Sequence, residues 1–259
     1  MQEKNLKRGL EMKSKGYYTP HKVKLLNNFG KTAGLVKNSV TVKYGADFAD
    51  RLYRNALQEF EALIPQIPHV KERRGAALNS FLLITAQEIA LYKAMKKQGK
   101  TPGEAWEVCH EALTLRVDAL SKLKRWFLKQ MMYSGILRRR LQKLTEMGKP
   151  LGFGDSEIRY VPGDGENFDF GIDYVKCGNY EFAKEQGVGE FAPYICMSDI
   201  ALSRAMNWGL IRTETLADGC KRCDFRFKRG GQTRISSKTP EVQTTIDRIA
   251  KMESRIQKH

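Results

Sequence analysis

Apolar residues in the first half of the chain recur every three or four positions, the spacing of helices that bury one face. In residues 46–63 this pattern includes Phe48, Leu52 and Phe60, and prolines end it shortly afterwards. A second run of this kind covers about 75–98. The sequence therefore predicts two amphipathic helices in this region.

Two more helical segments are predicted before residue 147. Thr101, Pro102 and Glu104 form a start signal, because the hydroxyl can cap the helix, proline suits its first position and the carboxylate suits its first turn. The stretch 119–146 also has helical spacing, and it contains eight Lys or Arg residues before its first acid, Glu146. We expect its basic face to meet solvent or the acids of a neighbouring helix or second subunit.

The hydrophobic period changes from helical to alternating after Pro150. Alternation predicts strands, and Gly-containing turns separate them. The predicted elements in chain order are strands at 158–161 and 168–177, helices at about 179–186 and 192–207, a hairpin of strands 210–216 and 220–229, and a last helix that begins after Thr239.

This order of elements predicts an α+β fold, in which a helical N-terminal half packs on a small antiparallel ββααββ module with a C-terminal helix. The predicted division is a basic, largely extended N-terminal arm at 1–44, a helical subdomain at 45–150, the α+β module at 151–234, and the C-terminal helix at 235–259.

Composition and charge narrow the class of protein. The 259 residues carry a net charge of +16, but residues 151–234 hold eleven basic and thirteen acidic side chains. A nucleic-acid binder is therefore disfavoured, since the region richest in motifs is slightly acidic. No apolar run approaches the ~20 residues of a membrane-spanning helix. The odd count of five cysteines argues against a disulfide framework, so we expect a soluble, reduced, cytoplasmic protein.

Alternation along the predicted strands sorts the candidate chemical groups by face. Cys177 falls in phase with Asp173, on the less apolar side of its strand. Cys223 falls in phase with the phenylalanines that follow it, whereas Asp224 and Arg226 share the opposite face. Each cysteine is either a buried filler or a thiol with a chemical role.

The predicted hairpin also pairs charges across its two strands. If it closes through residues 217–219, Glu214 lies opposite Arg222, and Arg212 lies opposite Asp224. Two interpretations stay open: exposed cross-strand ion pairs, or a charged platform that holds a small anion.

The remaining cysteines raise the question of a metal. Cys196 and Asp199 share one face of a predicted helix. Cys223 belongs to a lone CxxC, so a zinc site would need Cys177 and Cys196 to complete it, and we keep zinc only as the weaker alternative to a site without metal or cofactor. Residues 111–258 contain no histidine, which disfavours a Ser-His-Asp or Cys-His arrangement there.

Several ordered motifs resemble the L-2-amino-thiazoline-4-carboxylic acid hydrolase family. They are Asp173-Tyr174-Val175-Lys176-Cys177, Glu185-Gln186-Gly187, Cys196-Met197-Ser198-Asp199, the run from Arg212 to Gly219, and Cys223-Asp224-Phe225-Arg226-Phe227. The helical stretches from Gly75 to Asn79 and from Leu91 to Ala105 are also similar. The resemblance covers about residues 45–229, and it implies hydrolytic opening of a cyclic amidine-like ring, at a non-peptide C–N bond, to a carbamoyl-cysteine on the route to L-cysteine.

The resemblance also implies a set of site residues. The catalytic candidates are Cys177, Cys196, Asp199, Cys223 and Asp224, and the candidates for substrate binding are Arg226, Arg212, Asp173 and Asn79. A thiolate or an activated water would attack the ring carbon, a carboxylate would move protons, and an arginine would hold the substrate carboxylate. Which thiol attacks, if any does, stays open.

Two other function classes remain as alternatives. One is a non-catalytic module whose cysteines are structural or hold a metal or cofactor. The other is a binder of nucleic acid or an anionic surface, built on the basic stretch 119–146, although we expect Trp126, Phe127 and Tyr133 to lie in the core. The expected partner is a small-molecule substrate, and a homo-oligomer is an alternative to a monomer.

Overall fold

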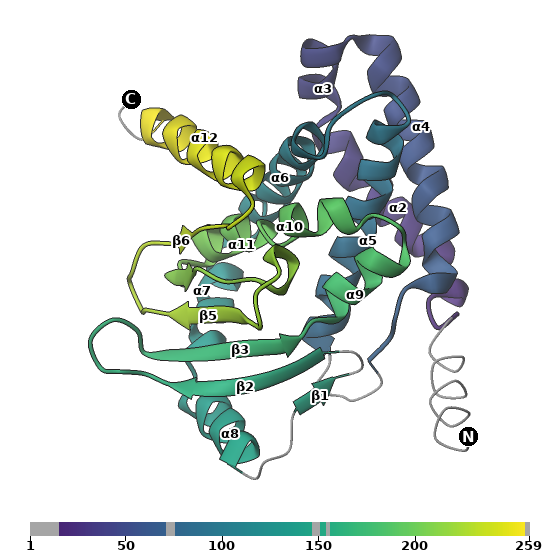
Figure 1. The fold of residues 1–259 in the computed structure, drawn as a ribbon. Helices are drawn as coiled ribbons and strands as arrows, with labels where there is room; N and C mark the ends of the chain where they lie inside the picture. The colour runs from purple at the N-terminus through teal and green to yellow at the C-terminus, as the bar shows by residue number, and fades with distance from the viewer. Residues whose placement is uncertain (1–15, 71–75, 147–150, 154–155, 257–259) are drawn as a thin grey trace. The chain divides into compact units, whose positions relative to one another are not determined.

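A computed structural model describes residues 16–70, 76–146, 151–153 and 156–256 (Figure 1). The chain divides into two compact units: Met1–Ala112 with Gly178–Phe191, and Leu113–Cys177 with Ala192–His259. Helices dominate the first half and a sheet lies in the second, which confirms the predicted α+β class. The division at residues 44, 150 and 234 stays a prediction.

The first unit is helical. It contains short 3-10 turns at Thr19–His21, Ile64–Gln66 and Gly189–Phe191, and the helices α2 (Lys22–Leu35), α3 (Lys37–Tyr44), α4 (Ala46–Leu63), α5 (Ala76–Lys96), most of α6 (Pro102–Asp118) and α9 (Gly178–Glu185). The predicted apolar face of α4 is buried, and Phe60 packs against Phe29 of α2 with ring centroids 4.7 Å apart.

The start signal before α6 forms the predicted capping box. The backbone N–H of Glu104 donates to the Thr101 hydroxyl at 3.3 Å, and the N–H of Thr101 donates to the Glu104 carboxylate at 2.9 Å. Two N–H groups that a helix start leaves without partners are thereby satisfied.

The prediction of a largely extended arm was wrong for its described part. Residues 22–44 form α2 and α3, and Phe29, Val36 and Val40 are buried. These three apolar residues form the buried side of two lysine-containing helices. Three widely spaced apolar residues among many lysines do not give a sustained helical pattern in the sequence. Residues 1–15 lie outside the described residues.

The second unit holds a six-stranded sheet in the order β1-β2-β3-β5-β4-β6. Its strands are β1 (Leu151–Phe153), β2 (Ser156–Pro162), β3 (Phe170–Lys176), β4 (Leu210–Arg212), β5 (Cys223–Phe227) and β6 (Arg234–Ile235), and its helices are α7 (Lys122–Met132), α8 (Gly135–Glu146), α10 (Ala192–Ile195), α11 (Ser198–Met206) and α12 (Pro240–Ile256). A 3-10 turn, η5, covers Leu216–Asp218. The sheet is not wholly antiparallel as predicted, because β4 and β6 run parallel.

The register of β4 on β5 differs by one residue from the predicted hairpin. Leu210 pairs with Phe227 and Ile211 with Arg226, because β4 ends at Arg212 and a long connection containing η5 leads to β5. A shift of one residue moves every side chain of a strand to the other face of the sheet. Arg212 consequently lies on the face of Phe225, not opposite Asp224 as predicted.

The predicted helix 119–146 is two helices, α7 and α8. The prediction that its aromatic residues are core is right for Tyr133, which is buried, and wrong for Trp126 and Phe127, which are exposed. Across the residues that the structure describes, no helix combines the length and apolar content needed to cross a bilayer.

Candidate functional site

An ion pair between a buried arginine and a half-buried aspartate lies in the second unit. Arg212, at the end of β4, is 2% exposed and donates from Nη1 to the carboxylate of Asp199 in the first turn of α11. Its guanidinium carbon lies 5.3 Å from the ring centroid of Phe225 on β5. The arginine of this pair is thus shielded from water, which strengthens its interaction with the half-buried carboxylate.

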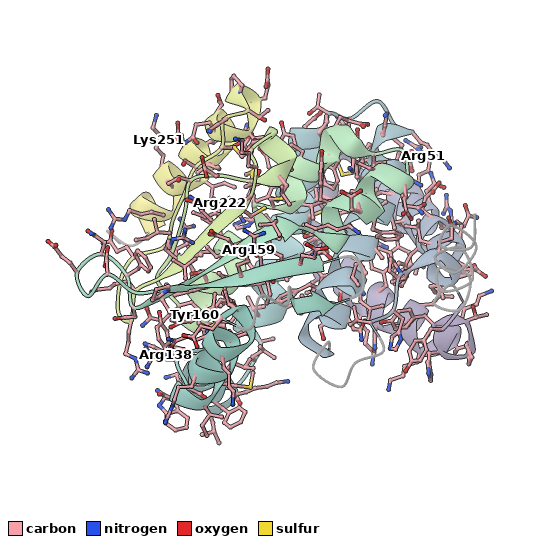
Figure 2. All side chains as sticks on the ribbon, turned by 60° about the horizontal axis from the view of Figure 1, so that its bottom comes forward. Arg51, Arg138, Arg159, Tyr160, Arg222 and Lys251 are labelled. Atoms are coloured by element: carbon pink, nitrogen blue, oxygen red, sulfur yellow. The ribbon has the colours of Figure 1, made fainter. Side chains whose placement is uncertain are left out.

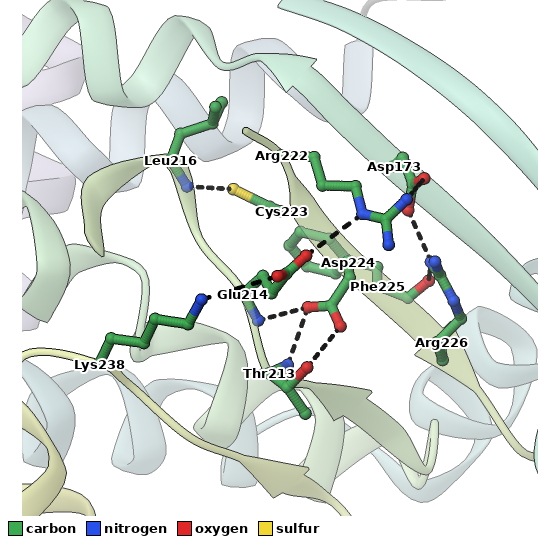
Figure 3. Close-up of polar contacts among 10 residues, drawn as sticks. All are labelled: Asp173, Thr213, Glu214, Leu216, Arg222, Cys223, Asp224, Phe225, Arg226 and Lys238. Atoms are coloured by element: carbon green, nitrogen blue, oxygen red, sulfur yellow. Dashed lines mark hydrogen bonds and ion pairs between the residues drawn. The ribbon is translucent and has the colours of Figure 1, made fainter. Parts of the chain in front are cut away.

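Two thiols, Cys196 and Cys223, interact with this ion pair, and Cys177 interacts with both of them. Cys223 begins β5, is buried, and its sulfur accepts a hydrogen bond from the backbone N–H of Leu216 at 3.2 Å (Figure 3). Cys196 joins α10 to α11, and Cys177 directly follows β3. The electrostatic interactions of Cys196 include Arg212, Cys223 and Cys177. We call Cys177, Cys196, Cys223, Asp199 and Arg212 the Asp199 cluster.

Burial dominates the protonation of these groups. It raises the pKa of Cys196 well above its ordinary value and that of Cys223 to about 12, and Arg212 offsets only part of either rise. Burial likewise raises the pKa of Asp199, against the opposing effect of Arg212. Burial alone would lower the pKa of Arg212. The interactions with Asp199, Cys196 and Cys223 outweigh this effect and raise the pKa of Arg212. Near neutral pH both thiols therefore carry their protons and Arg212 is charged.

Tyr174 lies beside the Asp199 cluster, although it is not among the site residues predicted from the sequence. It pairs with Cys223 across β3 and β5. Burial first, and then the charges of Cys177, Asp199 and Cys223, raise the pKa of its phenol. The signal was present in the alternation of β3, but only the β3–β5 register shows which strand neighbour Tyr174 has.

The predicted phase of Cys177 fails at the end of its strand. The alternation put Cys177 with Asp173, but β3 ends at Lys176. The thiol instead acts electrostatically on Tyr174, Cys196 and Cys223. Alternation holds only while the backbone stays extended, so it cannot place a residue beyond the strand.

The opposite face of the sheet carries a separate set of charges. The buried carboxylate of Asp173 accepts from Arg222 at 3.0 Å and from Arg226 at 2.8 Å (Figure 3). Figure 2 shows Arg159 and Arg222 on this side of the sheet. Gly171 makes room for Arg226, since a Cβ there would approach the Arg226 side chain to 2.8 Å. Arg226 and Asp173 thus satisfy each other rather than facing the thiols.

Asp224 holds the connection between β4 and β5. Its carboxylate accepts from the N–H of Thr213 at 2.8 Å, from the Thr213 hydroxyl at 2.7 Å and from the N–H of Glu214 at 2.6 Å. The predicted pair of Glu214 with Arg222 is present at 3.4 Å. The predicted contact of Asp224 with Arg212 is absent, because the register shift turns Arg212 to the other face.

Asp224→Ala is expected to lower the free energy of unfolding by about 1–2 kcal/mol, because the exposed N–H of Thr213 and the half-buried N–H of Glu214 both lose their acceptor. Asp224→Asn keeps one acceptor oxygen and should lose less. Denaturant unfolding measures both, with the exposed carboxylate variant Glu185→Ala as control. An unfolding midpoint for Asp224→Ala equal to that of Glu185→Ala would show that these hydrogen bonds do not order the connection.

Comparison with known protein families assigns most of the second unit to a family. A sequence model of the family described as L-2-amino-thiazoline-4-carboxylic acid hydrolase matches residues 80–227, more than half of the chain. The chain belongs to this family. No curated protein and no solved structure matches the chain.

The match to the L-2-amino-thiazoline-4-carboxylic acid hydrolase family includes the whole Asp199 cluster and strands β1 to β5, whereas β6 lies beyond it. Asn79, predicted to bind substrate, directly precedes the matched segment and lies in the first unit. Its side chain donates to the carbonyl of Val70 at 2.9 Å and accepts from the N–H of Val70 at 2.8 Å. In this structure it ties a helix to the preceding segment.

The zinc alternative gains no structural support. In the described ranges of this family member, no three His, Cys, Asp or Glu side chains are grouped so that they could hold a metal ion. Cys177, Cys196 and Cys223 act on one another electrostatically, and the five cysteines of the chain are present as thiols.

Proposed function

We propose that this family member hydrolyses a small cyclic amidine that carries a carboxylate, of the 2-amino-thiazoline-4-carboxylate type, at the Asp199 cluster. The observation that carries the proposal is the Arg212–Asp199 pair, whose arginine is buried and which lies close to thiols of the matched segment. Strongly shifted pKa values that share a charge partner favour a chemical role over simple packing.

Asp199 is the proposed proton acceptor. The ring carbon of such a substrate is bonded to two nitrogens and a sulfur, so a nucleophile must add to it and lose a proton as it does. The raised pKa values of Cys196 and Cys223 disfavour a resting thiolate. Water activated by the Asp199 carboxylate is therefore the favoured nucleophile, with Arg212 holding that carboxylate in place.

Hydrolysis needs one bond to form and one to break. The water oxygen bonds to the ring carbon, the ring C–N bond breaks, and both water protons end on the departing nitrogen, which becomes an amine. The carbamoyl group then stays on sulfur. Tyr174, whose raised pKa keeps the phenol protonated, is a hydrogen-bond donor for the developing charge.

Arg212 is the proposed contact for the substrate carboxylate. It uses Nη1 for Asp199, while its buried Nε has no hydrogen-bond partner among the described residues. A buried donor without an acceptor is costly, so a ligand oxygen at this place would be stabilised. The planar guanidinium suits a carboxylate because it offers parallel donors.

Incubation of the purified protein with 2-amino-thiazoline-4-carboxylate tests the proposal. We expect a product heavier by one water, seen by mass spectrometry, together with a new primary amine. A new free thiol instead would mean that the C–S bond breaks, which keeps the hydrolysis but contradicts the C–N assignment. No product at enzyme concentrations near those of the substrate would contradict the proposed function.

Cysteine replacements test the role of the cluster. Cys177→Ser, Cys196→Ser and Cys223→Ser test whether a thiol attacks in place of water. Replacement of an attacking thiol should abolish most of the activity while the variant melts within a few degrees of the wild type, whereas attack by water activated by Asp199 should leave all three variants active. Cys109→Ser is the matched control, because burial also raises the pKa of that thiol, outside the cluster. Cys220→Ser is the half-buried control. Equal activity in all five variants would exclude a chemical role for the thiols.

A further inference from the structure

Helix α7 exposes large apolar side chains. None of its residues is buried. The exposed apolar residues on α7 and the start of α8 are Leu123 (74% exposed), Trp126 (57%), Phe127 (59%), Met131 (50%) and Ile136 (76%), and we call them the α7–α8 face. The four on α7 recur at helical spacing, so they form one stripe, and a stripe of this size on a surface marks an interaction site.

Basic side chains flank this stripe. Lys122 and Lys124 are exposed on α7, and α8 adds the exposed Arg139 and Lys143. Helix α7 contains no acid, and within the described residues no carboxylate lies at ion-pair distance from Lys122 or Lys124. Figure 2 labels Arg138, another basic side chain of α8. The surface therefore combines apolar bulk with uncompensated positive charge.

We propose that the α7–α8 face binds an anionic lipid surface, with α7 lying in the plane of the interface. Helices of this kind place Trp, Phe and Leu among the acyl chains and keep Lys and Arg at the headgroups. The 11 residues of α7 span only about 16 Å, which suits a helix that lies on a membrane.

Two other occupants fit the observations less well. Nucleic acid would use the lysines and the aromatic rings, but it offers nothing to Leu123, Met131 and Ile136. A second copy of the chain would cover the apolar stripe, but a symmetric contact would also bring its lysines together. An anionic bilayer satisfies both the apolar and the basic parts of the surface.

Vesicle co-sedimentation of the full chain tests the proposal. We expect binding to phosphatidylcholine vesicles with 30% phosphatidylglycerol at 100 mM salt, and at least tenfold weaker binding to pure phosphatidylcholine. Lys122→Glu/Lys124→Glu should weaken binding at least tenfold. The matched control is Lys24→Glu/Lys31→Glu, which reverses two exposed lysines of α2. If the control variant loses as much binding as the α7 variant, the binding is nonspecific and the proposal fails.

The apolar stripe is tested in the same assay. Leu123→Ser/Phe127→Ser should weaken binding at least tenfold, whereas Val23→Ser/Val42→Ser, which alters exposed residues of α2 and α3, should not. Wild-type fluorescence should be quenched by brominated lipid more strongly than that of Trp126→Phe, because the two other tryptophans are fully buried (Trp106) or half-buried (Trp208).

Three further results would overturn the proposal. They are no binding to either vesicle by the folded protein, tighter binding to duplex DNA or RNA than to anionic vesicles at the same salt, and a dimer in sedimentation experiments that Leu123→Ser/Phe127→Ser dissociates.

Discussion

Asp199→Asn is expected to lower kcat at least ~100-fold, with the melting temperature close to that of the wild type. Asparagine keeps the shape of the side chain and one acceptor for Arg212, but it cannot take a proton from water. Loss of a positioned general base typically costs ~10²–10⁴ in rate. Steady-state kinetics with 2-amino-thiazoline-4-carboxylate measure the change.

The matched control for Asp199 lies on the other face of the same sheet. Asp173 is also a carboxylate paired with arginine, but it is more deeply buried than Asp199 and its partners are Arg222 and Arg226. Asp173→Asn should therefore keep most of the activity of the fraction that folds. Loss of activity in Asp173→Asn, with full activity in Asp199→Asn, would move the site to the charged face and contradict our assignment.

The pH dependence follows from the same carboxylate. A general base must be ionised, so activity should fall as the pH drops through the pKa of Asp199. Because burial raises that pKa, the acidic limb of the wild type should lie above the range of an ordinary aspartate. The remaining activity of Asp199→Asn should lack this limb. An unchanged limb in that variant would assign it to another group.

Local signals in the sequence predicted much of the fold. The spacing of Phe48, Leu52 and Phe60 predicts α4 with its observed bounds, and the Thr101–Glu104 signal predicts the first turn of α6. These signals are local, because a helix is determined by neighbours within a few turns along the chain. The alternating pattern likewise identifies β3, but it does not show that the strand ends before Cys177.

The composition of the candidate site was predictable, but its arrangement was not. The sequence identifies Cys196, Asp199 and Cys223 as candidates, and the structure brings them together with Arg212. The sequence could not separate these residues from Asp224 and Arg226, because a shift of one residue in the β4–β5 register decides which face of the sheet Arg212 occupies. That register depends on the length of the β4–β5 connection. The sequence predicts a short turn at 217–219, whereas the connection runs from Arg212 to Cys223.

Arg212→Met is expected to have a large effect on stability and to lower the free energy of unfolding by about 2–4 kcal/mol. Removing one partner of a buried ion pair leaves the other charge without compensation, at a cost of ~3–5 kcal/mol when burial is complete. The Asp199 side chain keeps 30% exposure, so we expect somewhat less. Methionine fills most of the volume, which limits any cavity.

A double-mutant cycle separates this ion-pair effect from packing. In Arg212→Met the Asp199 carboxyl loses its compensating charge, so its pKa in the folded state should rise further above the unfolded value. The folded state then binds a proton more tightly than the unfolded state, and the deficit relative to wild type should shrink as the pH falls through that pKa. Asp199→Asn/Arg212→Met should recover part of the lost stability at neutral pH, since no charge stays buried alone. A deficit that is independent of pH and unchanged in the double variant would show that Arg212 stabilises the fold by packing on Phe225 instead.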